Sequence, residues 1–152
     1  MRKVRVLVLV ILSLLIMVAV PHSQAPPAGG AGGRGEYLVE EVARCGECHT
    51  PKDSQGDWDQ ARWLQGAAVW FRPIKPMSDW AYSAPRLAGL PSFSDDQART
   101  VLTKGIGPNG FAIRPPMHIY HMSPEDAQAI IAYLRKGLGS AGVSPALLKE
   151  TK

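Results

Sequence analysis

The chain has little cysteine, little surplus charge beyond its N-terminus, and no grouping of side chains typical of an active site. Its only two cysteines are Cys45 and Cys48, and a disulfide between them would close a very short, strained loop. No paired carboxylates flank an obvious cleft, and no Ser-His-Asp arrangement can be assembled. The sequence also shows no internal repeat and no second domain. We therefore do not expect an enzyme.

The net charge is small once the basic N-terminus is set aside. The formal value is +4, from 17 Lys and Arg against 13 Asp and Glu. Arg2, Lys3 and Arg5 belong to a segment that we expect to be removed, which leaves 14 basic residues against 13 acidic ones. The apparent basicity is a targeting feature, so it predicts no binding to nucleic acid.

The N-terminus lacks an apolar run long enough to span a bilayer comfortably. The run from Val6 to Val20 falls short of the ~20 residues that a spanning helix needs. It follows a basic start and precedes Ser23-Gln24-Ala25, a small-x-small cleavage site. This pattern predicts a signal peptide over residues 1–25 and an exported protein, with an uncleaved membrane anchor as the alternative.

The rest of the chain is the size of one domain. Residues 26–34 are rich in Pro, Gly and Ala and predict a flexible linker. Residues 35–138 suffice to build one hydrophobic core. Residues 139–152 break into a Gly-containing stretch that predicts a flexible C-terminal tail.

The two cysteines stand in the motif Cys45-Gly46-Glu47-Cys48-His49. This C-x-x-C-H spacing is the attachment signature of c-type haem. Two thiols about one helical turn apart can each add to one vinyl group of the porphyrin, and the histidine then lies under the iron. The motif predicts one covalently bound haem c, with Cys45 and Cys48 as thioether donors and His49 as the proximal iron ligand.

Two further interpretations of the motif stay open at this point. A dithiol redox motif would require a thioredoxin-like alternation of strands and helices around it, and none is visible in the sequence. A zinc site would need four ligands, and His118 and His121 are the candidates to complete a Cys2His2 set with Cys45 and Cys48.

Amphipathic patterns predict helices over residues 36–45, 94–104 and 123–135. In the first, Leu38, Val42 and Cys45 recur at helical spacing on one face, so this helix delivers the chain to the motif. In the second, Ser94 is a good N-cap and Gln97 completes a capping box.

Stop and start signals delimit the second and third helices. Gly105 is the natural end of the second. Ser123 caps the third, and Pro124 occupies its first position. The predicted buried stripe of the third helix consists of Ala127, Ile130, Ile131, Leu134 and Leu138.

Successive blocks of the sequence form a recognisable series. They are residues 35–39 (GEYLV), 45–51 (CGECHTP), 83–87 (SAPRL), 114–117 (RPPM), 123–127 (SPEDA) and 132–135 (AYLR). Together they resemble the monohaem cytochrome c family, and in particular the bacterial subgroup that includes cytochrome subunits of alcohol and other periplasmic dehydrogenases. The resemblance implies an all-α fold, a small domain of three or more short helices wrapped around one haem, with the first and last helices crossing.

The resemblance also implies a methionine as the sixth iron ligand shortly before the last helix. Met117 fits, because Pro115-Pro116 gives an extended, donor-poor backbone that can present a thioether. Met122 precedes a helix cap, where an apolar side chain usually packs onto the helix. Met77 is expected to be an adaptable packing residue. His118 leaves ligation by two histidines open.

The remaining site predictions concern the segment after the motif. In the family a proline carbonyl accepts the second ring N–H of the haem histidine, and Pro85 matches that proline, while the neighbouring arginine has no assigned role. Residues 52–92 are rich in Trp, Pro and Gly and predict an irregular loop around one haem edge. Trp80 or Tyr82 is a candidate donor to a haem propionate, and aromatic walls for the pocket are the alternative.

These features predict a periplasmic one-electron carrier that passes electrons between a dehydrogenase and an acceptor such as an oxidase. Its partners would be redox proteins, with membrane association if the N-terminal segment is uncleaved. The alternative is a haem-based ligand-binding or enzymatic module whose sixth coordination position is open or displaceable.

Overall fold

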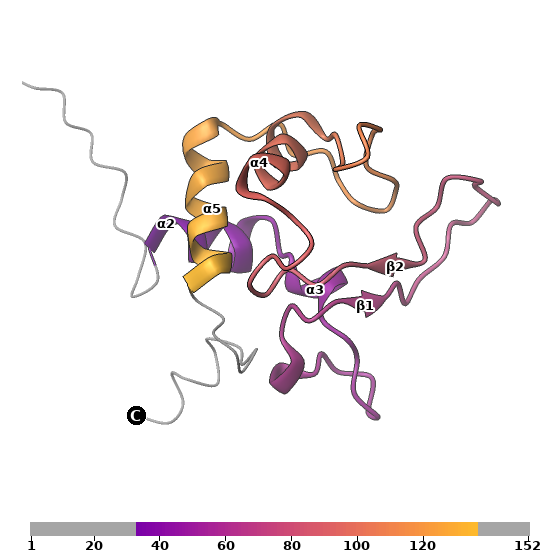
Figure 1. Ribbon diagram of the computed structural model, residues 1–152. Helices are drawn as coiled ribbons and strands as arrows, with labels where there is room; N and C mark the ends of the chain where they lie inside the picture. The colour runs from indigo at the N-terminus through magenta and orange to yellow at the C-terminus, as the bar shows by residue number, and fades with distance from the viewer. Residues whose placement is uncertain (1–32, 137–152) are drawn as a thin grey trace, which may run out of the picture.

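The computed structural model describes residues 33–136 (Figure 1). The elements are α2 (Gly33–Tyr37), η1 (Leu38–Val42), α3 (Gly46–His49), η2 (Gln60–Arg62), β1 (Ala67–Ala68), β2 (Ser83–Ala84), α4 (Asp95–Lys104) and α5 (Pro124–Lys136). The predicted signal peptide, the tail, Leu138 and most of the linker lie outside the described residues. Gly33 and Arg34, which were expected to end the linker, begin α2 instead. None of the described helices is long and apolar enough to cross a bilayer.

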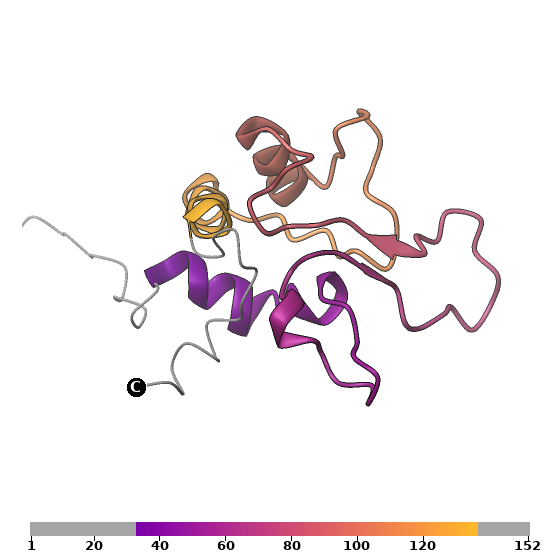
Figure 2. The same cartoon turned by 60° about the horizontal axis from the view of Figure 1, so that its bottom comes forward.

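The helices pack as a crossed pair with a third beside them. α5 lies across α2, and α4 packs against α5 (Figures 1 and 2). Gly35 is buried at the crossing, where an added Cβ would lie 2.1 Å from the carbonyl oxygen of Ala129. Only glycine therefore fits. The core comprises Leu38, Val39, Leu64, Ala88, Leu90, Ala98, Ile130, Ile131 and Leu134.

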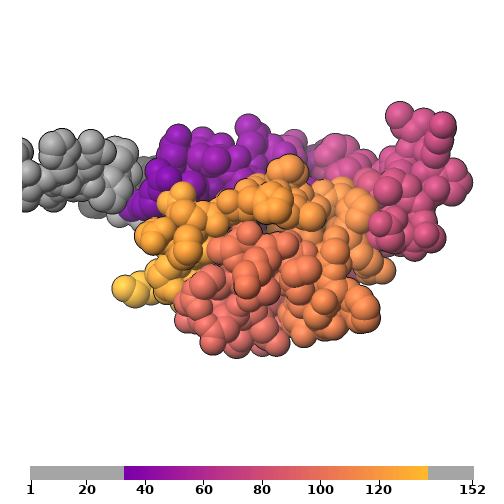
Figure 3. Space-filling view, turned by 90° about the horizontal axis from the view of Figure 1, so that it is seen from above, coloured from indigo at the N-terminus to yellow at the C-terminus, as the bar shows by residue number. Residues whose placement is uncertain are grey.

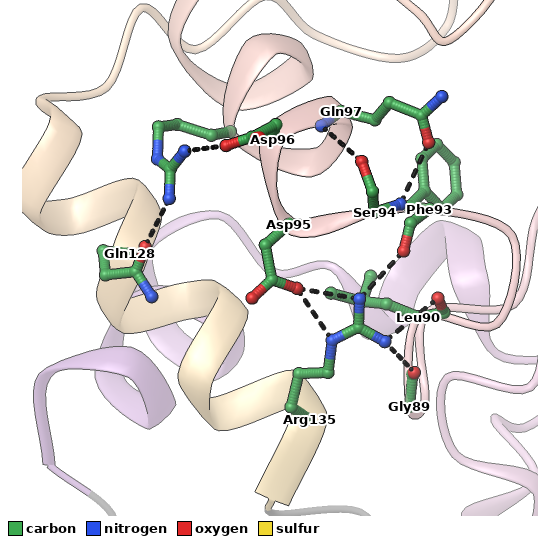
Figure 4. Close-up of polar contacts among 10 residues, drawn as sticks. Gly89, Leu90, Phe93, Ser94, Asp95, Asp96, Gln97, Gln128 and Arg135 are labelled. Atoms are coloured by element: carbon green, nitrogen blue, oxygen red, sulfur yellow. Dashed lines mark hydrogen bonds and ion pairs between the residues drawn. The ribbon is translucent and has the colours of Figure 1, made fainter.

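The second and third predicted helices are confirmed as α4 and α5. Ser94 Oγ accepts the Gln97 N–H at 3.2 Å, and the Gln97 side chain accepts the Ser94 N–H at 2.9 Å (Figure 4). Gly105 ends α4 with a left-handed φ of 68°. Ser123 Oγ accepts the N–H of Asp126 at 3.1 Å at the start of α5. The stripe Ala127, Ile130, Ile131 and Leu134 is buried as predicted.

Arg135 holds the last turn of α5 against the segment that leads into α4 (Figure 4). Its guanidinium donates to the Asp95 carboxylate at 2.8 and 2.9 Å. It also donates to the carbonyl oxygens of Gly89 and Phe93, each at 2.8 Å. One side chain thus joins the C-terminal turn of α5 to the start of α4 and the segment before it.

The first predicted helix differs from the structure in both its bounds and its geometry. It begins at Gly33 and widens into a π-helix at Leu38, where the Ala43 N–H bonds to the Leu38 carbonyl at 2.8 Å. The wider turn rotates the residues that follow. Val39 is therefore buried and Val42 is 54% exposed. The predicted place of Val42 in the apolar stripe was wrong, because it assumed α-helical spacing throughout.

The described domain combines short helices with a small two-stranded sheet and irregular segments, so the expected all-α class is not confirmed. β1 and β2 pair antiparallel, with Ala67 opposite Ala84 and Ala68 opposite Ser83. A ladder of two residues per strand is too short to show an alternating pattern in the sequence. Between the strands, residues 69–82 extend away from the helices (Figure 1), and we refer to them as the projecting loop.

Candidate cofactor cavity

The C-x-x-C-H motif forms one compact turn of helix. Arg44, with a φ of 49°, redirects the chain between η1 and α3. The His49 N–H bonds back to the Cys45 carbonyl at 3.0 Å. Gly46 allows the ring of Trp63 to pack against α3, since an added Cβ would lie 2.1 Å from that ring. The local sequence therefore determines both the spacing of the motif and the packing of the Trp63 ring against it.

His49 is buried, and its ring is oriented by Pro85. Nδ1 of His49 lies 2.8 Å from the Pro85 carbonyl oxygen. Because a carbonyl only accepts, we assign the proton to Nδ1, which leaves the lone pair on Nε2. Burial lowers the pKa of the His49 imidazole, and the hydrogen bond to Pro85 opposes this to a lesser degree. His49 therefore presents a neutral nitrogen donor of the kind that iron binds.

The β ladder brings Pro85 to this position. Gly66, directly before β1, donates its N–H to the His49 carbonyl at 2.8 Å. Gly66 also lies close to the backbone around Pro85, since a Cβ added to it would lie 2.9 Å from the amide nitrogen of Arg86. The Thr50 hydroxyl accepts the Leu64 N–H at 3.0 Å and is fully buried. The histidine and its acceptor are thus held by main-chain contacts.

A cavity of about 870 Å³ adjoins α3. This volume lies within the range of roughly 300–1,000 Å³ that is typical of small-molecule sites. Apolar side chains form much of its wall, from Val69 beside β1 to Val101 of α4 and Ile113 beyond it. The predicted site residues that line it together are Cys45, Cys48, His49, Pro85 and Met117.

The structure separates the candidate sixth ligands. Met117 and His118 line the cavity, whereas Met77, His121 and Met122 are not among its lining residues. Met122 packs partly buried against the core. Met77 is 41% exposed on the projecting loop, so the expectation that it fills a packing gap was wrong.

The competing interpretations of the motif find little support in the described part of the chain. Within residues 33–136, no three His, Cys, Asp or Glu side chains are grouped to hold a metal ion, so the Cys2His2 set is not formed. Burial, and secondarily the charge of Glu40, raises the pKa of the Cys45 thiol to about 12. Burial also raises the pKa of Cys48. A reactive dithiol would instead have a lowered thiol pKa.

None of the four tryptophans lines the cavity, so the expected aromatic walls are not made of indole rings. Trp80 is buried against Phe71, with ring centroids 5.7 Å apart. Its Nε1 is the buried side-chain polar atom that has no hydrogen-bond partner within residues 33–136. The next residue, Ala81, lines the cavity. Trp80 itself does not line the cavity, so its role as a donor to a haem propionate stays a prediction.

Tyr120 is a site residue that the sequence analysis missed. It lines the cavity, and its hydroxyl donates to the Ala43 carbonyl at 3.1 Å. Burial raises the pKa of Tyr120 to about 12. This hydrogen bond ties the segment that carries Met117 to the segment before Cys45. No local pattern in the sequence indicates it, because the two partners are far apart along the chain.

Comparison with known proteins gives relatives but no matching family model. The chain is 33% identical over 111 residues to a fructose dehydrogenase cytochrome subunit from Gluconobacter japonicus, which covers 67% of this chain and 21% of that protein. It is 32% identical over 109 residues to a dihaem c-type cytochrome from Cereibacter sphaeroides, covering 68% and 34%.

A third relative is the cytochrome c subunit of a quinone-dependent alcohol dehydrogenase from Gluconobacter oxydans. It is 32% identical over 112 residues, which covers 67% of this chain and 23% of the relative. The matched segment thus spans between about a fifth and a third of the length of these three relatives.

Proposed function

Since the chain belongs to the bacterial c-type cytochromes, we propose that it is a monohaem, periplasmic electron carrier. It would take single electrons from a dehydrogenase and pass them to an acceptor such as an oxidase. The observation that carries this proposal is the convergence of Cys45, Cys48, His49, Pro85 and Met117 on one cavity. A single C-x-x-C-H motif in the sequence supports one haem.

The residues of the cavity have separate tasks. Cys45 and Cys48 hold the porphyrin by thioether bonds, and the bound haem supplies a one-electron iron couple. His49 offers Nε2 as the proximal ligand, because its Nδ1 proton is engaged by the Pro85 carbonyl at 2.8 Å. Largely apolar walls limit the access of water to this site.

Met117 is the proposed distal ligand. A thioether opposite imidazole favours the reduced state and fills the position that an external ligand would need. Tyr120 constrains the same segment through its hydrogen bond to the Ala43 carbonyl. The arrangement therefore favours electron transfer over ligand binding.

The test is carbon monoxide binding and redox titration of the holoprotein. We expect the reduced wild-type protein to bind carbon monoxide slowly and weakly. Met117→Ala should bind it readily and have a lower reduction potential. The shift should be on the order of 0.1 V, a fraction of the roughly 0.8 V over which axial ligands act. Met77→Ala is the matched control, since Met77 is an exposed methionine outside the cavity lining.

Two outcomes would contradict this assignment. Rapid carbon monoxide binding by the wild-type protein, with no change of spectrum or potential in Met117→Ala, would favour the ligand-binding or enzymatic module. The same changes in His118→Ala, and not in Met117→Ala, would assign the distal position to His118, which also lines the cavity.

A further inference from the structure

Val69 and Ala81, at the two ends of the projecting loop, line the cavity, but its exposed part has no task in the proposed function. That part carries the most exposed apolar side chain of the described domain. It reaches beyond the body of the molecule in the ribbon views and in the space-filling view (Figures 1, 2 and 3). Ile74 is 101% exposed, and Trp70 and Tyr82 are each 58% exposed. Met77 adds a further apolar side chain. Large apolar groups gathered on a protrusion indicate a contact surface.

The neck of this loop, formed by Val69, Trp70 and Tyr82 where the loop leaves the domain, is held by several contacts. The Val69 N–H bonds to the Tyr82 carbonyl at 3.0 Å across the neck. The Trp70 indole donates to the Glu47 carbonyl of α3 at 3.4 Å. The Lys52 ammonium lies 5.1 Å from the Trp70 ring centroid, a cation–π contact. The exposed tip is therefore presented from a fixed base.

The tip of the loop, residues 72–77, is cationic and has a stiff backbone. Arg72 and Lys75 flank Ile74, and Asp79 is the one acidic residue between positions 60 and 94. Pro73 and Pro76 bracket the tip; they restrict its backbone and remove two N–H donors that would otherwise need hydration. This combination lowers the cost of moving the tip into a less polar medium.

We propose that the projecting loop inserts shallowly into the headgroup region of a bilayer that contains anionic phospholipid. Ile74 and Met77 would enter the acyl boundary, while Arg72 and Lys75 meet the lipid phosphates. Trp70 and Tyr82 lie at the neck, and these residue types favour the level of the membrane interface. The contact is made by residues 69–82 and does not require the N-terminal segment.

A bilayer fits this surface better than a protein partner does. The apolar residues form a convex tip, and the fully exposed Ile74 would need a partner with a deep complementary pocket. A fluid bilayer adapts to a small protrusion and supplies negative charge next to apolar chains. The guanidinium of Arg72 lies 5.6 Å from the Tyr82 ring centroid, so this charge is next to an aromatic residue of a type that favours the membrane interface.

The experiment places an environment-sensitive dye on Ile74→Cys in the purified holoprotein. Vesicles of phosphatidylcholine and phosphatidylglycerol should shift its emission to the blue, and a nitroxide near the headgroups should quench it. Vesicles of phosphatidylcholine alone should do neither. Val42→Cys with the same dye is the control, because Val42 is an exposed apolar residue on η1. The comparison of the two sites holds whether or not the N-terminal segment also binds the vesicles.

Charge variants test the same contact independently. Each cation near an anionic surface contributes a factor of about five to the affinity, so Arg72→Gln with Lys75→Gln should weaken insertion of the labelled loop about 25-fold. Asp79→Asn should strengthen it. The proposal is overturned if the dye at position 74 does not respond to anionic vesicles, or if positions 42 and 74 respond alike. It is also overturned if position 74 responds to an added dehydrogenase and not to vesicles.

Discussion

Gly35 shows how one missing side chain sets the geometry of the domain. The residue lies on α2 where α5 crosses, and an added Cβ would meet the Ala129 carbonyl oxygen at 2.1 Å and Tyr133 Cβ at 2.8 Å. The first contact is with backbone, so it cannot be relieved by a change of rotamer. The two helices would have to move apart.

Gly35→Ala is therefore expected to destabilise the holoprotein by about 1–3 kcal/mol, as overpacking of a close contact does. Helix propensity alone predicts the opposite sign, a gain of roughly 1 kcal/mol for alanine over glycine. The free energy of unfolding, measured in guanidinium chloride, distinguishes overpacking from helix propensity, because the two predict changes of opposite sign. An increase in the free energy of unfolding would show that the helices are not in close contact at Gly35.

At the scale of the element, η1 determines which side chains face the core. The π-helical turn buries Val39 and directs Glu40 toward α5. Glu40 Oε1 accepts the Trp63 indole N–H at 3.1 Å and the Tyr133 hydroxyl at 2.9 Å. A carboxylate thus joins the first helical segment to α5 and to the loop that packs on α3.

This carboxylate should make stability depend on pH. Burial raises the pKa of Glu40, and the two hydrogen bonds oppose this only in part. The folded protein then retains a proton that the unfolded chain releases. Its free energy of unfolding should fall as pH rises from the ordinary glutamate range to the raised pKa of Glu40.

Glu40→Gln keeps an acceptor oxygen and removes this ionisation. The difference in free energy of unfolding between variant and wild type should therefore grow in favour of the variant across that pH window. Glu41→Gln, at the exposed neighbouring position, is the matched control. A difference that is flat with pH, or that grows toward acid, would contradict burial of the Glu40 carboxylate.

At the scale of the described domain, the helices of residues 33–136 are short, and two of them, α3 and α4, line a large cavity. α2 has 5 residues, α3 has 4, α4 has 10 and α5 has 13. Isolated helices shorter than about 12–15 residues are marginal in water, so most of these depend on tertiary packing. A cavity of about 870 Å³ adjoins α3 and α4. The covalently held group should therefore supply much of the apolar surface that the helices cover.

Removal of the attachment should unfold the domain. Cys45→Ala with Cys48→Ala is expected to lose most of its helical circular dichroism and its cooperative thermal transition. Met117→Ala, which keeps the covalent attachment, should retain both and serves as the control. Persistent cooperative helix in the double variant would show that the chain folds without the porphyrin.

Local signals in the sequence were sufficient for α4, α5 and the motif. Ser94, Gln97 and Gly105 act within one helix, so their roles can be deduced from neighbouring residues alone. The π-helical turn at Leu38 and the β ladder at Ala67 were missed, because tertiary packing determines the first and the second is only two residues long.

The cavity residues likewise divide into those that the local sequence predicts and those that only the folded structure reveals. Cys45, Cys48 and His49 follow from their spacing, whereas the contact of Tyr120 with Ala43 and the unpartnered indole of Trp80 arise only in three dimensions.

The carbonyl of Glu47 has a mechanical consequence. It accepts hydrogen bonds from the indoles of both Trp58 and Trp70, and Lys52 lies over both rings. Through Trp70, these contacts join the base of the projecting loop to the turn that bears Cys48 and His49. Displacement of the loop would therefore be expected to reach that turn through Trp70.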